Sequence, residues 1–192
     1  MDLTKRQVTF FRVREGSSGP DLKPVREVVS EKVWRAMTDA SEALRSIGVK
    51  HALVGGLAVG AYGWPRATRD VDFLVDDNAW LKTESGLVTL RAGIPVQAHG
   101  IAVDTISVRD DERHLLRAIE AAEISEGIPV ISLEALVYLK LASPRSQDRQ
   151  DVLHLVRAGA DIDRARQYLD ANAPKLREKF EAIVRTAEEE ED

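Results

Sequence analysis

The chain has 192 residues, 44% of them hydrophobic, and a formal net charge of −5 at pH 7. This length can bury the core of one domain, and the absence of cysteine excludes disulfides and thiolate metal sites. No apolar run approaches the roughly 18 residues that span a membrane, and the first ten residues lack the apolar segment of a signal peptide. We therefore expect a cytoplasmic protein without a membrane partner, which binds any RNA through a local basic patch rather than its overall charge.

Residues 1–29 are predicted to form an N-terminal arm. Within it, Gln7–Val13 contains β-prone residues that suit an edge strand, and residues 15–24 form a loop rich in Gly, Ser and Pro. The arm is basic because it carries Lys5, Arg6, Arg12 and Arg14. A solvated arm is the simplest interpretation, and contact with nucleic acid or a partner is the alternative.

A helix is predicted from Ser30, a typical N-cap residue, to about Ile47. Its apolar residues recur at helical spacing, and Gly48 stands where a helix commonly ends. The helix leads into a short apolar run, His51–Val54, which is typical of a buried strand.

Two glycines, Gly55 and Gly56, follow this strand directly. Glycine allows the backbone to approach a ligand closely, and a helix that starts there directs free N–H groups at an anion. Small and apolar residues at 57–62 suit a short packed helix, which Gly63 and Pro65 end. The arrangement indicates a phosphate-binding site, although it differs from a Walker loop because no Gly-Lys-Ser/Thr follows.

The next strand is predicted over Asp70–Val75, and it places Asp70 and Asp72 on the same face. Two carboxylates at this separation repel each other unless a cation lies between them. Mg²⁺ takes such oxygen ligands together with substrate phosphates. The pair therefore indicates a metal site. In the alternative interpretation, the carboxylates cap a turn or pair with Arg66 and Arg69.

The middle of the chain is less regular. Asp76 and Asp77 are expected to cap a short helix over residues 78–86. Residues 86–95 are ambiguous between strand and helix, and residues 97–100 suit a turn.

A strand follows over Ile101–Val108, with Ala102, Asp104 and Ile106 on one face. A carboxylate in an apolar strand is costly to bury without a partner, and a metal ion would provide one. Asp104 is therefore a candidate metal ligand. The alternative is a structural aspartate that accepts hydrogen bonds from the backbone.

The rest of the chain is predicted to be helical, apart from a short strand over 128–131. Helices are expected over residues 110–123, 132–143 and 146–159, and over two parts of 161–192 that are broken at residues 172–174. The four histidines lack metal-ligand spacing: His51 begins a strand, His99 lies in a turn, His114 is expected at the surface, and His154 is expected without a function.

Lys140 falls on a largely apolar helix, where a lysine extends to solvent or meets an anion. Asp148 and Asp151 lie three residues apart on the next helix, on one face, where they can pair with Lys140 or Arg145. The alternative is a surface helix with exposed salt bridges.

Two runs of residues carry a family resemblance. The Gly-Gly pair, followed by Arg66-x-Thr68-x-Asp70-x-Asp72, resembles the polymerase-β-type nucleotidyltransferase superfamily. It is similar to the abortive-infection nucleotidyltransferase toxins of bacterial type IV toxin–antitoxin systems and to aminoglycoside nucleotidyltransferases. The run from Lys140 through Arg145 to Asp151 is similar to a second motif of the toxins. Together the likeness covers about residues 50–170.

This resemblance implies an α/β (α+β) nucleotidyltransferase fold, with a small mixed β-sheet flanked by helices. Residues 30–131 would form the core, and residues 132–192 a helical C-terminal part packed on it. The implied reaction transfers a nucleoside monophosphate from a nucleoside triphosphate, such as ATP, to an acceptor and releases pyrophosphate.

The resemblance also implies roles for individual residues. The metal ligands and catalytic residues, for Mg²⁺ or Mn²⁺, would be Asp70, Asp72 and Asp104. The nucleotide would contact Gly55, Gly56, Arg66, Thr68, Lys140 and Arg145. Supporting positions would be Asp148 and Asp151.

The toxins imply an RNA acceptor, for example a tRNA 3′ end, and a cognate antitoxin as a protein partner. The antibiotic-modifying enzymes imply a cationic small molecule, such as an aminoglycoside, which an acidic protein would suit. A third interpretation is a non-catalytic member that binds a nucleotide or a partner protein.

Overall fold

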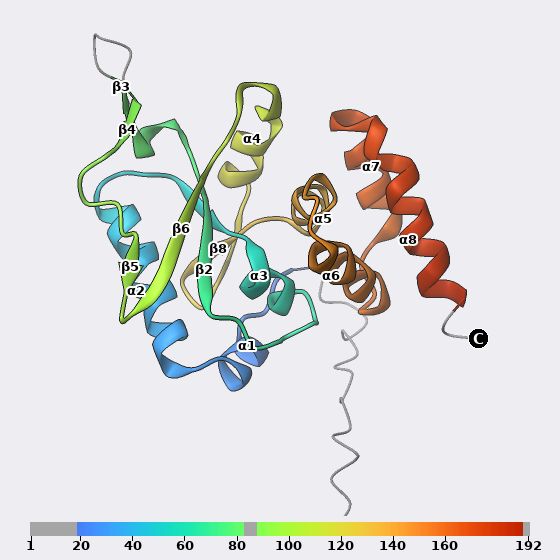
Figure 1. Cartoon of the computed structure of the whole chain (residues 1–192), viewed down its shortest axis with the longest axis horizontal. Coiled ribbons are helices and arrows are strands. Elements are labelled where there is room, and N and C mark those ends of the chain that lie inside the picture. Colours follow the sequence, from blue (N-terminus) through green and yellow to red (C-terminus); the bar gives the residue numbers. More distant parts are fainter. Residues whose placement is uncertain (1–18, 83–87, 190–192) are drawn as a thin grey trace, which may run out of the picture.

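A computed structural model describes residues 19–82 and 88–189 of the chain (Figure 1). The predictions for Gln7–Val13 and for the basic residues of the arm therefore lie outside the described residues, as does the part of the expected helix that falls on residues 83–87.

The described residues form helices and short strands. The helices are α1 (Lys23–Val28), α2 (Glu31–Ser46), α3 (Gly55–Ala61), α4 (His114–Glu120), α5 (Leu133–Ala142), α6 (Ser146–Arg157), α7 (Ile162–Asn172) and α8 (Arg177–Glu189). The strands are β1 (His51–Leu53), β2 (Asp70–Val75), β3 (Trp80–Lys82), β4 (Val88–Leu90), β5 (Gln97–Ala98), β6 (Ile101–Ser107), β7 (Glu123–Ser125) and β8 (Ile128–Val130). Short 3₁₀ turns lie at Asp77–Ala79, Asp110–Glu112 and Pro174–Leu176.

Six of the strands form one mixed sheet in the order β5-β6-β2-β1-β8-β7, and β3 pairs with β4 in a separate hairpin. Strand β2 is parallel to β6 and antiparallel to β1. Helix α2 packs against β1, β2, β5 and β6. Because Ala102, Asp104 and Ile106 are exposed, α2 covers the opposite face, to which Val103 and Phe73 point.

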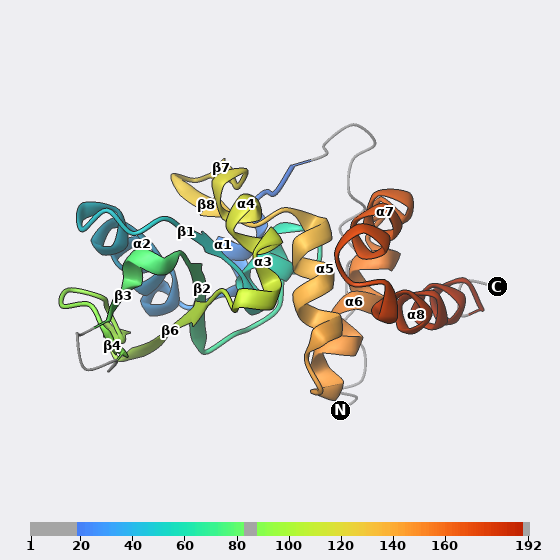
Figure 2. The same cartoon turned by 90° about the horizontal axis from the view of Figure 1, so that it is seen from above.

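The C-terminal helices lie to one side of the sheet (Figure 2). Helix α5 contacts α3 and packs on α6 and α7, and α8 packs on α6 and α7 further from the sheet. This mixed sheet with flanking helices and a helical C-terminal part confirms the predicted α/β fold class. Among the described residues, no helix has the length and apolar character that a membrane span requires.

Local signals placed several elements correctly. The Ser30 side chain accepts a hydrogen bond from the Val33 N–H at 3.3 Å and caps α2. Gly48 follows α2 with a φ of +73°, which favours glycine. Strand β2 has the predicted bounds, and the Ser132 side chain caps α5.

The predicted solvated arm is wrong for residues 23–28, which form helix α1, and the predicted loop of residues 15–24 is wrong at its last two residues. Leu22 and Val25 are buried, and the Leu22 N–H donates to the Ser125 hydroxyl at 2.9 Å. Helix α1 packs on α3, so tertiary contacts stabilise a segment whose composition is typical of a loop. The division into an arm, a core and a C-terminal part stays a prediction.

Three further predictions need correction where hairpins form. Asp76 caps a 3₁₀ turn, but Trp80–Lys82 is a strand instead of the expected helix and pairs with β4. The ambiguity between strand and helix is resolved as a strand for Val88–Leu90, and residues 91–95 form neither. Gln97–Ala98 is also a strand, and the turn comprises only His99 and Gly100. The helix predicted to Glu123 ends at Glu120, and Glu123 begins β7. The β5–β6 hairpin turns on His99 and Gly100, and the β7–β8 hairpin turns on Glu126 and Gly127. All four of these residues have a positive φ.

Candidate metal and nucleotide site

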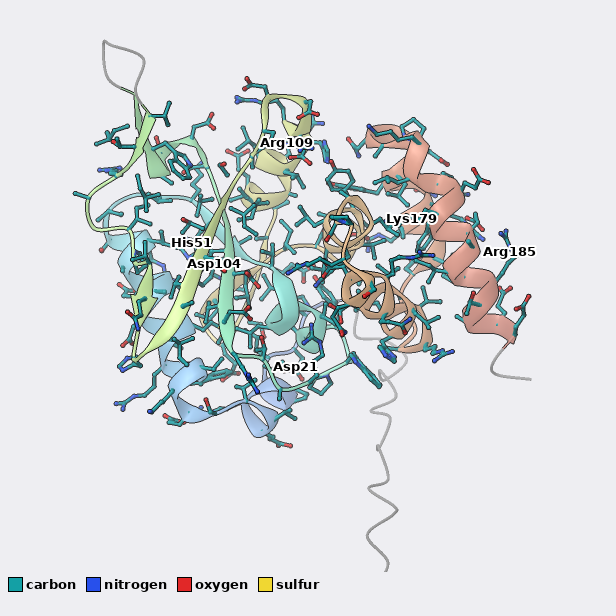
Figure 3. All side chains as sticks on the ribbon, viewed as in Figure 1. Asp21, His51, Asp104, Arg109, Lys179 and Arg185 are labelled. Carbon is teal, nitrogen blue, oxygen red and sulfur yellow. The ribbon has the colours of Figure 1, made fainter. Side chains whose placement is uncertain are left out.

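Three carboxylates meet on the uncovered face of the sheet. Asp70 and Asp72 lie on β2, and the parallel register places Asp104 of β6 opposite Asp72. Asp104 is labelled in Figure 3. Each of the three offers an oxygen, and these oxygens all lie within 4.8 Å of one another. Three carboxylate oxygens this close are a suitable donor set for a hard divalent cation such as Mg²⁺ or Mn²⁺.

The predicted burial of Asp104 is wrong. Asp104 and Asp70 are exposed and Asp72 is half-buried. Asp104 therefore belongs to the carboxylate group because of its register with Asp72, and not because it is buried in an apolar strand.

Burial and the neighbouring carboxylates change the protonation of Asp72. Partial burial, together with the charges of Asp70 and Asp104, raises the pKa of Asp72 to about 6 from an ordinary value of 3.8. Lys140 and Arg145 act in the opposite direction, so positive potential reaches Asp72 from the C-terminal helices. A bound divalent cation would relieve the repulsion that raises this pKa.

Gly55 makes the close approach of α3 to Asp72 possible. Its φ is +65°, and a Cβ at this position would lie 1.8 Å from Asp72 Oδ2. The Val54 N–H also donates to the Asp72 carbonyl oxygen at 2.9 Å. At Gly56 a Cβ would lie 3.3 Å from Arg66 Nη2 and from Thr68 Oγ1. The glycine pair therefore leaves room for the side chains that surround the first turn of α3.

The segment before β2 connects the triad with α6. The Thr68 hydroxyl donates to Asp70 Oδ1 at 2.7 Å. Arg66 donates from Nε and Nη2 to the two carboxylate oxygens of Asp151, at 3.2 and 3.1 Å. These bonds fix Asp70 from one side and hold the Arg66 guanidinium group beside Gly56.

A buried ionic network lies between α5 and α6. The Lys140 ammonium group donates to Asp148 Oδ1 and Asp151 Oδ2, each at 2.7 Å, and Arg145 Nε donates to Asp148 Oδ2 at 2.7 Å. Lys140, Asp148 and Asp151 are at most 5% exposed. The contacts expected from the sequence spacing are thus present, and the alternative of a surface helix with exposed salt bridges is wrong for these three residues.

The network fixes the charges of its members. Burial alone would raise the pKa of both aspartates, but hydrogen bonds from Lys140, with Arg145 at Asp148 and Arg66 at Asp151, hold each pKa below its usual value. Lys140 uses two of its three N–H donors on these carboxylates, which leaves one for a ligand. The Arg145 side chain remains 74% exposed and can contact a ligand as well.

Sequence reasoning missed an aromatic contact beside this network. Trp64 and His154 stack with ring centroids 3.8 Å apart and an interplanar angle of 8°. No local pattern predicts it, because the two rings come from distant parts of the chain. His114, expected at the surface, is half-buried and packs edge-on against Tyr138 and Tyr168.

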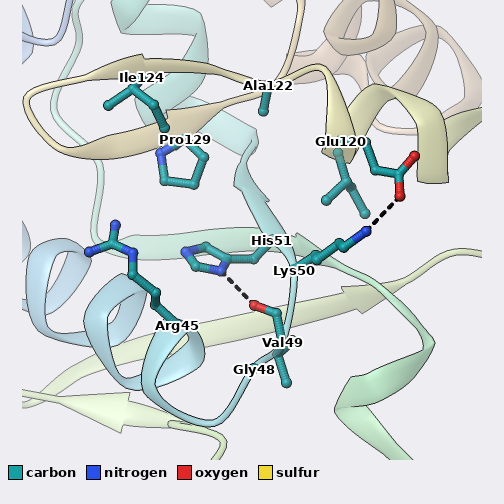
Figure 4. A pocket seen from close by; sticks show the side chains of 10 residues that line it. Arg45, Gly48, Val49, Lys50, His51, Glu120, Ala122, Ile124 and Pro129 are labelled. Carbon is teal, nitrogen blue, oxygen red and sulfur yellow. Dashed lines mark hydrogen bonds and ion pairs between the residues drawn. The ribbon is translucent and has the colours of Figure 1, made fainter.

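A separate groove of about 500 Å³ lies at the other end of β1, away from Gly55 (Figure 4). Its lysine, Lys50, pairs with Glu120 at 2.6 Å, and Arg45 donates to the Gly127 carbonyl at 2.9 Å. His51 bonds with the Ser41 hydroxyl and the Val49 carbonyl. These polar groups have partners within the protein, and the groove is not part of the acidic site.

No protein-family model matches the chain, and no curated protein is significantly similar to it in sequence. Among solved structures, the chain is similar to an antigenic nucleotidyltransferase-like protein from Paracoccidioides brasiliensis. The two share 16% identity over 81% of this chain and 94% of that chain, with a TM-score of 0.43. A likeness of this size assigns neither a family nor an activity, so the function has to be argued from the residues of the site.

Proposed function

We propose that the chain is a metal-dependent nucleotidyltransferase, which transfers a nucleoside monophosphate from a nucleoside triphosphate to an acceptor. The observation that carries this proposal is the convergence of Asp70, Asp72 and Asp104 within 4.8 Å across two parallel strands. Burial and, after it, the charges of Asp70 and Asp104 raise the pKa of Asp72, and a bound cation would offset both costs of the ionised form.

Asp70, Asp72 and Asp104 would hold Mg²⁺ or Mn²⁺, which supplies charge stabilisation at the attacking and leaving oxygens of the displacement. In the reaction, an acceptor hydroxyl oxygen forms a bond to the α-phosphorus, and the bond from that phosphorus to the bridging α–β oxygen breaks. Pyrophosphate leaves with the bonding electrons. Asp104, which is exposed beside the other two, takes the hydroxyl proton on a carboxylate oxygen.

The positive side of the site suits the triphosphate. Lys140 and Arg145 act electrostatically on Asp72, which supports a role for their charge in binding a phosphate chain at the triad. Arg66 lies beside Gly56, where the backbone is free of side-chain bulk. The protein thus contributes positioning and charge neutralisation, which are the main requirements of phosphoryl transfer.

We further propose RNA as the acceptor. Arg69 and Arg149 are exposed, as is Arg145, and Arg69 precedes Asp70 directly in the chain. A polyanion gains from these charges, whereas a cationic aminoglycoside is repelled by them. The net charge of −5 favours the small cationic acceptor, so the acceptor has to be decided by experiment. A cognate antitoxin as partner is proposed from the sequence resemblance alone.

The test is nucleotide transfer in the presence of Mg²⁺, with each labelled nucleoside triphosphate in turn. The acceptors are total tRNA, an aminoglycoside panel and the protein itself, and the control is the Asp70→Ala/Asp72→Ala double variant. Label on tRNA that is lost in the double variant is the expected result. Label on an aminoglycoside overturns the RNA acceptor, and no label on any acceptor counts against the enzyme and favours a binding protein.

A further inference from the structure

Residues 64–69 connect α3 with β2 (Figure 1), and the side chains of this segment make contacts that hold it. Between Pro65 and Arg69, the structure shows no backbone–backbone hydrogen bond to another described residue. Yet this segment ends at Asp70 and carries Thr68, whose hydroxyl fixes one oxygen of that carboxylate. Its anchors therefore determine how well Asp70 is placed in the triad.

Three anchors occur at alternate positions. Trp64 stacks on His154, Arg66 binds Asp151, and Thr68 binds Asp70. In an extended chain such positions point to the same side. Trp64, Arg66 and Thr68 are half-buried, as is Pro65, whereas Ala67 and Arg69 are exposed. The three contacts, and not an alternation of burial, therefore define the anchors of the segment.

Helix α6 provides a matching pair of groups. Asp151 and His154 lie three residues apart, on one face of the helix, and each meets one anchor of the segment. His154 Nδ1 is buried without a hydrogen-bond partner among the described residues. The contact that the structure shows for the imidazole is therefore its flat ring against the indole.

We propose that His154 is a positioning residue for the acidic triad. Its stack on Trp64 fixes the start of the 64–69 segment on α6, and so holds Thr68 where its hydroxyl orients the Asp70 carboxylate. This inference rests on the proposed function, because it concerns the metal site of that reaction. It assigns a role to a histidine that lies outside the sequence motifs.

The test is Mn²⁺ binding by the full chain, without nucleotide, measured as free Mn²⁺ by electron paramagnetic resonance. Groups that hold a metal ligand directly contribute about 10- to 100-fold in affinity, and His154 acts one step further away, so His154→Ala should weaken binding by about three- to tenfold. His154→Phe keeps a flat ring and should bind like the wild type. Gln150→Ala, an exposed change on the same helix, is the matched control.

A second variant, Trp64→Leu, removes the stack from the other side and serves if His154→Ala does not fold. Trp64→Leu should weaken Mn²⁺ binding to the same extent as His154→Ala. The double variant Trp64→Leu/His154→Ala should bind Mn²⁺ no more weakly than either single variant, because all three proteins lose the same contact. In 5-fluorotryptophan-labelled protein, the ¹⁹F signal of Trp64 should move in His154→Ala, which shows that the stack exists and has been removed.

The possible results separate the two proposals. If the wild type binds no Mn²⁺, the metal centre of the proposed function is wrong, and the role of His154 falls with it. If the wild type binds Mn²⁺ and the stackless variants bind it equally well, only the role of His154 is wrong. A His154→Phe variant as weak as His154→Ala also contradicts a role based on a flat ring.

Discussion

Asp72→Asn is expected to stabilise the metal-free protein at alkaline pH, although it removes a candidate metal ligand. Folding raises the pKa of Asp72 from 3.8 to about 6. For an acid with a raised pKa, the folded state disfavours the ionised form. Stability is therefore lost as the pH rises through the interval between the two values, and the loss is complete above about pH 6. Asparagine cannot ionise, so the variant avoids this loss.

The magnitude follows from the size of the shift. About two pKa units correspond to about 3 kcal/mol at full effect. Asp72 is only half-buried, and solvent screens part of the repulsion, so we expect a gain of about 1–2 kcal/mol. For a chain of this length, that gain raises Tm by about 2–8 °C.

The assay is urea unfolding in EDTA at pH 8.0 and pH 4.5, followed by circular dichroism. The gain should shrink to about a third at pH 4.5, where the folded protein already carries a protonated Asp72. Asp110→Asn, which changes an exposed carboxylate outside the triad, should alter stability little at either pH. A variant Asp72→Asn that is less stable than the wild type in EDTA at pH 8.0 would refute the crowding argument. So would a gain of equal size at both pH values.

Other predictions concern the surroundings of the triad. Gly55→Ala should cost about 2–5 kcal/mol in urea unfolding and abolish Mn²⁺ binding, because a Cβ there combines a φ of +65° with a clash 1.8 Å from Asp72 Oδ2. Gly56→Ala is the matched control and should lower the free energy of unfolding by about 1 kcal/mol or less. The contacts of a Cβ at Gly56 begin at 3.3 Å, and the helical φ of this residue suits alanine. Equal losses of stability in Gly55→Ala and Gly56→Ala would contradict this reasoning. Lys140→Met should lower the free energy of unfolding by roughly 3–5 kcal/mol in the same assay, because it leaves two buried carboxylates without their shared cation. A loss of stability below 1 kcal/mol would show that the network is not buried in solution. The affinity for Mn²⁺, followed by electron paramagnetic resonance, should rise with pH through about 6 and level off above it, because a proton competes for Asp72 below that pH; an affinity that does not change between pH 5 and 8 would exclude this carboxylate as a ligand.

The local parts of the site could be predicted from the sequence. The alternation of residues 70–75 gave β2 its bounds and placed Asp70 and Asp72 on one face, because side-chain direction in a strand depends only on spacing. The pairing of Lys140 with Asp148 also followed from spacing, because the two helices are joined by a short turn.

Contacts between distant segments could not be predicted in this way. Arg66 and Asp151 are 85 residues apart, and the stack of Trp64 on His154 spans a similar distance. The closeness of Asp104 to Asp72 depends on the register of β6, which no pattern within that strand specifies. Helix α1 was missed for the same reason, since it is stabilised by packing on α3 and not by its own propensity.

The most direct test of the central claim compares the wild type with Asp104→Asn in a single transfer reaction. Each protein is incubated with total tRNA, Mg²⁺ and a nucleoside triphosphate labelled at the α-phosphate, and both labelled RNA and pyrophosphate are measured. The account predicts that the wild type labels RNA and releases one pyrophosphate per nucleotide transferred. Asp104→Asn should lose both products while it still binds the nucleotide, because the proton acceptor and one metal ligand are gone. Equal transfer by the two proteins, or no transfer by the wild type with any of the four nucleotides, would contradict the account.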